Sequence, residues 1–205
     1  MTTIQPPLQQ DPTLLGQTIL IFAGPDFEDR ELFYPLYRFK EAGANVSVAG
    51  IGEASYKGKY GVPVSVDLQA EAALKQAQTK PWDAVIVPGG WAPDKIRMNQ
   101  AALDIVKASL NANKIVASIC HGGWVLSSAN VLKGRVVTSY CAIKDDMTHA
   151  GAQWRDDAVV IDADNHAGQG TLITSRTPDD LPAFCAAIVQ QLIQNAVTTR
   201  AAVQA

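Results

Sequence analysis

One cysteine stands where a protein chain often places a nucleophile. Cys120 directly follows an apolar run of strand length, Lys114 to Ile119, and a helical pattern continues from His121 to Ala129. A residue at such a tight strand-to-helix turn projects its side chain from the edge of the sheet, where the N–H groups of the next helix point at it. These groups favour a thiolate, so we expect a lowered pKa and a reactive sulfur.

The residues around this cysteine are small. Ser118 stands two positions before Cys120 and Gly122 stands two positions after it, which is the usual pattern of a sharp turn that exposes a nucleophile. The alternative is a buried, inert cysteine packed under a helix. His121 and the pair Gly122-Gly123 make poor core filler, which favours the reactive interpretation.

His121 is the nearest candidate for proton transfer. Adjacent residues on a helix do not face each other, so it is not expected to be a simple partner of Cys120. Its imidazole would assist if a carboxylate from elsewhere in the chain oriented it. The alternative is a histidine that faces solvent from the first turn of a helix.

The elements that must position these residues alternate between strands and helices. Such alternation predicts a three-layer α/β/α sandwich with a mostly parallel central sheet, flavodoxin-like, which binds its ligand at the carboxyl ends of the strands. Asp26 is expected to cap the first helix, Gly43 to end it, and Pro35 to kink it. The expected strands are 18–23, 45–50, 83–88, 114–119, 158–162 and 171–175, and the main helices are 27–42, 99–113, 121–129 and 178–196.

Size and composition bound the organisation of the chain. Its 205 residues are 47% apolar, enough for one substantial core, and no internal linker divides them. We expect a single domain over residues 17–197, with segments 1–16 and 198–205 unordered. The net charge of −3 comes without any basic block, which argues against nucleic acid or a membrane surface as a partner.

The beginning of the chain and its cysteines indicate a cytoplasmic protein. No apolar run near the start is long enough for a signal sequence or a membrane span. Three cysteines cannot all pair, and a chain of this size needs no disulfide, so free thiols are expected. Cys185 is expected in the core, whereas Cys141 invites the question of redox exchange with Cys120.

No metal site is expected. His149 and His166 have no cysteine, histidine or carboxylate at ligand spacing. The chemistry is therefore expected to need no metal and no cofactor.

Six segments in order resemble a known family. The sequence looks like a PfpI-type member of the DJ-one/PfpI superfamily, related in fold to the class I glutamine amidotransferases, over about residues 18–195. The matching segments are FEDREL (27–32), VPGGWAPD (87–94), ASICHG (117–122), TSY (138–140), IKDDM (143–147) and SRTPDDL (175–181).

The resemblance implies roles for the catalytic residues. Cys120 matches the nucleophile and Glu28 the buried glutamate that approaches the thiol, where a shared proton would explain the pair. Glu28 could instead be a first-turn acid that complements its helix dipole. Asp94 stands where the family has a glutamate that reaches the histidine from a neighbouring subunit. It is one methylene shorter, and its alternative role is an N-cap for residues 95–98.

The resemblance also implies how substrate is held. The N–H groups of Gly90 and His121 would form the oxyanion hole, and Tyr140 matches a pocket tyrosine, although an ordinary packed aromatic is the alternative. Trp91 would narrow the mouth of the pocket and so favour small substrates. The alternative is a surface or interface tryptophan. Gly123 departs from the family, which often has proline there.

Three functions remain open at this level. The first is a cofactor-independent glyoxalase or deglycase, in which Cys120 attacks a reactive dicarbonyl such as methylglyoxal or its protein adduct. The second is an intracellular PfpI-type cysteine peptidase, and the third is a redox sensor or holdase of stress protection. The expected partners are a small carbonyl substrate or a peptide, and other copies of the chain. We expect a dimer at least, and the resemblance suggests a hexamer with Asp94 donated across an interface.

Overall fold

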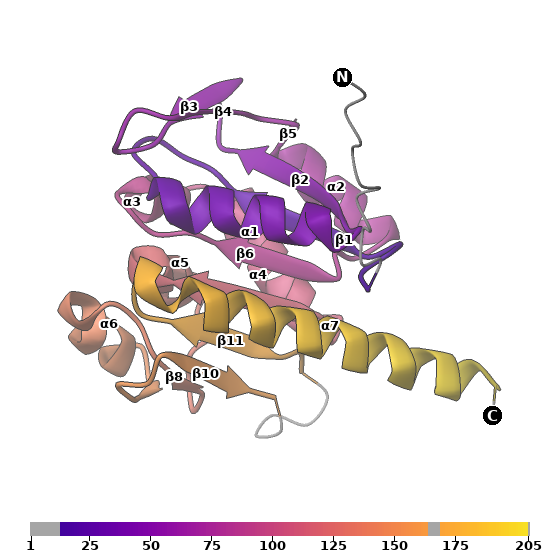
Figure 1. Cartoon of the computed structure of the whole chain (residues 1–205). Helices are drawn as coiled ribbons and strands as arrows, with labels where there is room; N and C mark the ends of the chain where they lie inside the picture. The colour runs from indigo at the N-terminus through magenta and orange to yellow at the C-terminus, as the bar shows by residue number, and fades with distance from the viewer. Residues whose placement is uncertain (1–12, 164–168, 205) are drawn as a thin grey trace, which may run out of the picture.

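The computed structural model describes residues 13–163 and 169–204, and its centre is a seven-stranded sheet (Figure 1). The strand order is β10-β11-β7-β6-β1-β2-β5. The bounds of these strands are β1 Thr18–Phe22, β2 Asn45–Gly50, β5 Leu68–Gln69, β6 Ala84–Val87, β7 Ile115–Ile119, β10 Val159–Asp162 and β11 Leu172–Ser175. All neighbours pair in parallel except β10, which pairs antiparallel with β11.

Helices cover both faces of this sheet. Figure 1 shows α1 (Asp29–Glu41) and α7 (Leu181–Gln204) in front of the sheet, with α2 (Ala70–Thr79) and α4 (Gln100–Asn111) behind it. The shorter helices are α3 (Ala92–Ile96), α5 (Gly123–Ser128) and α6 (Lys144–His149), and the 3-10 turns are η1 (Cys120–Gly122), η2 (Cys141–Ile143) and η3 (Pro178–Asp180). Strands β6 and β7 are buried along their whole length because both faces are covered, which explains their continuous apolar sequences.

The sandwich with a mostly parallel sheet is confirmed, and three boundaries differ from expectation. Asp26 does not cap the first helix: it has a φ of 55°, and the N-cap is Glu28. Helix α7 continues to Gln204, so residues 198–204 are helical where an unordered tail was expected. Residues 13–16 form a turn that buries Leu14, whereas residues 1–12 lie outside the described part of the chain.

Two small sheets that the sequence did not indicate flank the main one. The hairpin of β3 (Ser55–Lys57) and β4 (Pro63–Ser65) is held against the segment after β1. There the carboxylate of Asp29 accepts the N–H groups of Tyr60 and Val62 at 3.0 and 3.2 Å. A parallel pair, β8 (Val136–Val137) and β9 (Gln153–Trp154), lies beside β10.

One edge of the main sheet gathers the segments that matter for chemistry. Strands β1, β6, β7 and β11 are parallel, so their carboxyl ends lie together, on the left in Figure 1. Glu28, Gly90, Cys120 and Arg176 each follow one of these four strands. The topology therefore brings residues from four distant parts of the sequence to one place.

Candidate active site

Cys120 occupies the corner that its position in the sequence predicts, in an unusual backbone conformation. Its φ is 58°, in the left-handed region that residues with a side chain seldom adopt. Close packing behind the corner fixes this turn, because a Cβ on Gly122 would lie 2.4 Å from the carbonyl oxygen of Val87. Strain of this kind persists where the surrounding structure enforces it, and here it projects the thiol from the edge of the sheet.

Two backbone N–H groups, those of Gly90 and His121, are aimed at the sulfur of Cys120. Gly90 has a φ of +75°, and a Cβ there would lie 2.3 Å from the backbone nitrogen of Glu28, so only glycine fits. The same pair of donors was expected from the resemblance to hold an oxyanion. Their role as an oxyanion hole stays a prediction, since it concerns the oxygen of a substrate bonded to this sulfur.

Glu31 is the carboxylate that lies beside this thiol. It is fully buried in α1, and its Oε2 accepts the N–H of Gly89 at 2.7 Å. A Cβ placed on Gly89 would lie 2.6 Å from Glu31 Oε2 and 2.8 Å from Cys120 Cβ, so glycine lets the two side chains approach each other. The other oxygen, Oε1, is buried without a hydrogen-bond partner among the described residues.

The buried pair resists ionisation at both groups. Burial raises the pKa of Glu31 to about 8, although the hydrogen bond from Gly89 opposes this rise. Burial and the charge of Glu31 raise the pKa of Cys120 to about 12, against the opposing N–H groups of His121 and Gly90. The expected lowering of the thiol pKa is therefore wrong, because burial and the neighbouring carboxylate outweigh the dipole of a short helix. Because both pKa values lie above 7, the carboxyl of Glu31 and the thiol of Cys120 are both mostly protonated at neutral pH.

Glu28 does not make the contact with the thiol that the resemblance implied. Its Oε1 pairs with Arg30 Nε at 2.8 Å, and its Oε2 pairs with Lys59. One feature of the sequence marks Glu31 instead. Glu31, Pro35 and Phe39 are spaced four apart along α1 and all are buried, so this glutamate lies on the inward face of its helix.

His121 lies closer to the sulfur than helical spacing allows. Its Nδ1 is 3.3 Å from Cys120 Sγ, because the left-handed cysteine and the 3-10 turn that follows replace regular helix at this point. Burial, aided by the positive charge of Lys59, lowers the pKa of its imidazole. A neutral ring at this distance can accept the thiol proton.

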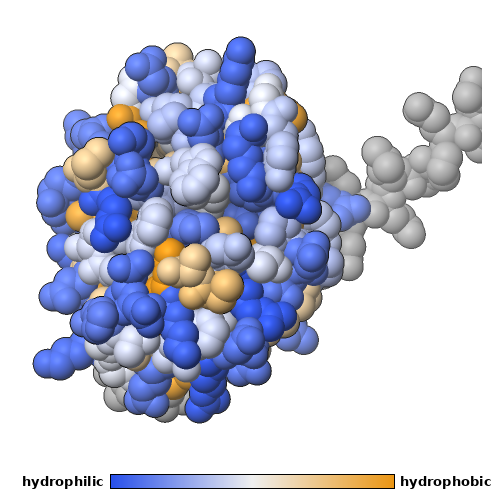
Figure 2. Space-filling model, turned by 90° about the vertical axis from the view of Figure 1, so that its left-hand side faces the viewer, coloured by the Kyte–Doolittle hydropathy of each residue, from blue (hydrophilic) through white to orange (hydrophobic). Residues whose placement is uncertain are grey.

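Three aromatic side chains surround the His121 ring. The ring centroids of Trp124 and Tyr140 are each 5.0 Å from it, and that of Trp91 is 6.0 Å away. Trp91 is 61% exposed and Tyr140 is 37% exposed, so both border solvent. Figure 2 views the molecule from the side on which the strands end, and a small hydrophobic group lies near the middle of a mostly hydrophilic face.

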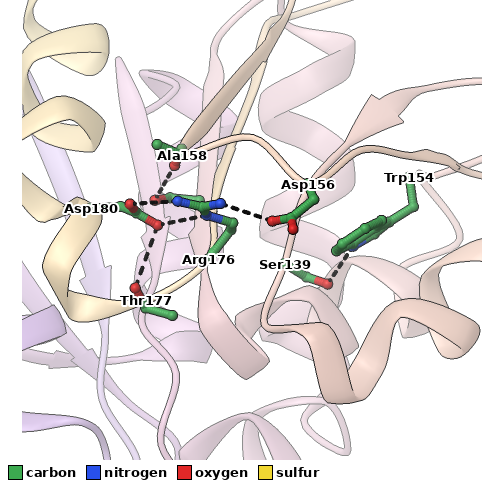
Figure 3. Close-up of polar contacts among 8 residues, drawn as sticks. Ser139, Trp154, Asp156, Ala158, Arg176, Thr177 and Asp180 are labelled. Atoms are coloured by element: carbon green, nitrogen blue, oxygen red, sulfur yellow. Dashed lines mark hydrogen bonds and ion pairs between the residues drawn. The ribbon is translucent and has the colours of Figure 1, made fainter.

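A polar network joins the segments that follow β11, β9 and β8 (Figure 3). The guanidinium of Arg176, which follows β11, bonds both carboxylate oxygens of Asp180 at 3.0 and 3.1 Å and Asp156 at 2.8 Å. Beside it, the indole N–H of Trp154 donates to Ser139 Oγ at 3.0 Å, and Ser139 directly precedes Tyr140. The loop between β9 and β10 is thereby tied to the end of β11 through Asp156, and β9 is tied through Trp154 to the segment that carries Tyr140.

Known proteins are similar to this chain in sequence and in architecture. The model of the DJ-1/PfpI family matches residues 17–191. The chain belongs to the DJ-1/PfpI family. A Pyrococcus furiosus member named Deglycase PfpI is 41% identical, over 85% of this chain and 98% of its own length. A Bacillus subtilis member named "Putative cysteine protease YraA" is 35% identical, over 83% of this chain and 95% of its own.

A solved structure of the family shows the same fold. It is a two-domain protein from Anabaena variabilis with a DJ-1/ThiJ/PfpI-like and a ferritin-like domain. It is 37% identical with a TM-score of 0.77, and the match covers 86% of this chain and 48% of that chain. The sequence resemblance to the family is confirmed over most of the chain.

Asp94 stands apart from the other expected members of the DJ-1/PfpI site. It lies in the first turn of α3, where Trp91 and not Asp94 is the N-cap, and its carboxylate pairs with Lys95 at 2.9 Å. The side chain is 56% exposed. Among the described residues of one copy, the bond and ring contacts of His121 are with Cys120, Trp91, Trp124 and Tyr140. The catalytic role of Asp94 therefore stays a prediction that depends on a second copy.

The remaining cysteines and histidines lie away from this centre or outside the described chain. Cys185 is buried in α7, as expected of a core thiol, and burial raises its pKa to about 12. Cys141 is exposed in η2, and His166 lies outside the described residues. Residues 13–163 and 169–204 contain no group of three metal-ligating side chains, and no helix there is long and apolar enough to cross a membrane.

Proposed function

We propose that this DJ-1/PfpI protein is a cofactor-independent cysteine-nucleophile enzyme that acts on reactive 2-oxoaldehydes such as methylglyoxal, or on their early protein adducts. The observation that carries the proposal is the surroundings of Cys120: two aimed backbone N–H groups, a protonated Glu31 and the Nδ1 of His121 at 3.3 Å. The name Deglycase PfpI, given to a relative that is 41% identical, supports it.

The first chemical step is the addition of sulfur to the aldehyde. His121 Nδ1 takes the thiol proton, and the sulfur then bonds to the aldehyde carbon while the carbonyl electron pair moves to oxygen. The N–H groups of Gly90 and His121 stabilise this oxygen. The imidazolium then gives its proton to this oxygen, which completes a hemithioacetal and leaves His121 neutral.

The second stage is an isomerisation followed by hydrolysis. Neutral His121 removes the hydrogen of the former aldehyde carbon as a proton, and the ketone oxygen gains a proton, which gives an enediol. A proton then adds to the former ketone carbon, and the hydroxyl on the sulfur-bearing carbon loses its proton to become the thioester carbonyl. The result is a thioester of a 2-hydroxy acid on Cys120. Water then cleaves the carbon–sulfur bond and regenerates the thiol. Methylglyoxal and one water thus yield lactic acid without a net oxidant or reductant.

The decisive measurement is lactate formation from methylglyoxal by the purified full-length chain, without glutathione or added metal. Cys120→Ser should abolish lactate formation, because a serine hydroxyl at the corner is a much weaker nucleophile than a thiol. The matched controls are Cys141→Ser and Cys185→Ser, one exposed and one buried thiol, which should both keep the activity. Unchanged lactate formation by Cys120→Ser would overturn the proposal.

A peptidase is the second candidate, favoured by the exposed Asp94 and by the name of the YraA relative. The same thiolate would acylate on a peptide carbonyl, and Asp94 from a neighbouring copy would orient His121. Hydrolysis of fluorogenic peptides that disappears in Asp94→Ala, with an unchanged oligomer by light scattering, would support this candidate. Inactivity across a broad peptide library would reject it.

A further inference from the structure

Two exposed aromatic side chains at the site are anchored next to the reacting atoms. Trp91 directly follows Gly90, and its backbone N–H donates to the carbonyl of Asp26 at 2.9 Å. The backbone N–H of Tyr140 donates to the carbonyl of Cys120 at 3.3 Å. The backbone of both residues is therefore held in place. Trp91 is the neighbour of Gly90 in the sequence, and Tyr140 is hydrogen-bonded to Cys120.

These two rings differ from the third aromatic in the cluster. Trp124 is committed within the protein, since its indole N–H donates to Asp146 at 2.8 Å and the guanidinium of Arg97 lies 5.6 Å from its ring. In the described part of the chain, the Trp91 indole N–H and the Tyr140 hydroxyl make no hydrogen bond. Their ring surfaces and donors thus remain free for a ligand at Cys120.

The position of a bound aldehyde follows from the donors. Its carbonyl carbon must meet the sulfur, and its oxygen must meet the N–H groups of Gly90 and His121. The substituent beyond the second carbonyl needs space that these buried groups do not leave, and the exposed aromatic side chains beside His121 are Trp91 and Tyr140. The surfaces it meets there are the rings of Trp91 and Tyr140, whose centroids lie 6.0 and 5.0 Å from the His121 ring.

We infer that the preferred substrates are 2-oxoaldehydes that carry an aryl or similarly flat apolar substituent, rather than methylglyoxal itself. The inference rests on the proposed function. A methyl group is too small to cover either ring, whereas an aromatic ring can pack against both and gain the extra stabilisation of aromatic pairs. The free indole N–H and phenol hydroxyl are available to the ketone oxygen.

The chemistry of such a substrate stays balanced. With phenylglyoxal, sulfur bonds to the aldehyde carbon, the proton on that carbon moves to the ketone carbon, and water releases the acid from the thioester. One phenylglyoxal and one water give one mandelic acid. The aldehyde carbon is oxidised and the ketone carbon is reduced within the same molecule.

The test compares kcat/KM for phenylglyoxal and methylglyoxal, from initial rates with the full-length chain. We expect the natural chain to favour phenylglyoxal by about tenfold, the effect of one good aromatic contact. Trp91→Ala should lose about tenfold on phenylglyoxal and less than about twofold on methylglyoxal, while Trp91→Phe keeps most of the preference. The control is Tyr34→Ala, a 41% exposed tyrosine on α1, which should change neither value.

The possible outcomes separate this inference from the proposed function. Turnover of both aldehydes without preference for the aryl compound would overturn the inference and leave the proposed function in place. An equal loss on both aldehydes in Trp91→Ala, with a smaller oligomer by light scattering, would assign Trp91 to an interface and also overturn it. Turnover of neither aldehyde by the natural chain would refute the proposed function and the inference together.

Discussion

We expect the natural chain to become less stable as the pH rises, because Glu31 loses a proton that the folded state holds tightly. Glu31→Gln should not show this loss of stability. Burial raises the pKa of Glu31 from its ordinary 4.5 to about 8 in the folded chain. Between these values the folded chain binds about one proton more than the unfolded chain, so the free energy of unfolding decreases as the pH rises through this window. Glutamine has no proton to lose, and its side-chain oxygen can still accept the N–H of Gly89.

The size of the effect follows from the two pKa values. They differ by about 3.5, and one pKa unit corresponds to about 1.36 kcal/mol, so the whole loss above pH 8 is at most about 5 kcal/mol. Part of the titration lies below about pH 5 or above about pH 8. Between these pH values the free energy of unfolding should therefore decrease by about 3 kcal/mol. This value does not depend on whether Glu31 or Cys120 releases the first proton, because it depends only on the number of protons bound by the two groups together.

Urea unfolding at several pH values between about 5 and 8, at one protein concentration, measures this directly. The difference in free energy of unfolding between Glu31→Gln and the natural chain should grow by about 3 kcal/mol in favour of the variant over this range. Glu41→Gln is the matched control, since Glu41 ends the same helix with its side chain 75% exposed, and its curve should run parallel to that of the natural chain. A parallel curve for Glu31→Gln as well would refute the raised pKa.

Two further predictions concern residues that support the site. Lys59→Met should raise the pKa of His121, because the charge of Lys59 adds to burial in lowering it. An NMR titration of the imidazole measures this pKa, and Lys59→Arg is the control that should keep the natural midpoint. An unchanged midpoint in Lys59→Met would contradict the prediction. Gly90→Ala should lower the free energy of unfolding by more than about 2 kcal/mol and abolish activity, because its Cβ would overlap the backbone of Glu28. Gly61→Ala, with a similar φ of +91° but open space around the Cβ, should cost only about 1 kcal/mol in the same urea experiment, and equal costs would show that the overlap is relieved.

The central strands and the nucleophile corner could be predicted because local patterns encode them. Strands β6 and β7 are apolar at nearly every position since both their faces are buried, and this leaves a continuous run in the sequence. The corner at Cys120 follows from the switch between a strand pattern and a helical pattern. Such signals need no knowledge of which strands become neighbours.

The choice between Glu28 and Glu31 could not be made from local patterns. A helix that began at Phe27 would place both glutamates in its first turns, and either could then face the sheet. In the structure Asp26 has a left-handed φ of 55° and the helix begins only at Asp29. Because each residue turns a helix by about 100°, the starting residue decides which glutamate faces inward. The turn that sets this start depends on contacts with Gly90 and Gly58, which are distant in sequence.

The sequence by itself determined the α/β/α architecture, the family and the position of Cys120 at a strand-to-helix corner, since periodicity and ordered motifs are local properties of the chain. Only the tertiary structure decided the environment of the sulfur. Glu31 and the N–H of Gly90 reach Cys120, and the rings of Trp91 and Tyr140 reach His121, from different segments that the parallel sheet brings to one edge. A pKa depends on burial and on nearby charges in space, so the raised pKa values of Glu31 and Cys120 could be recognised only after the chain was folded.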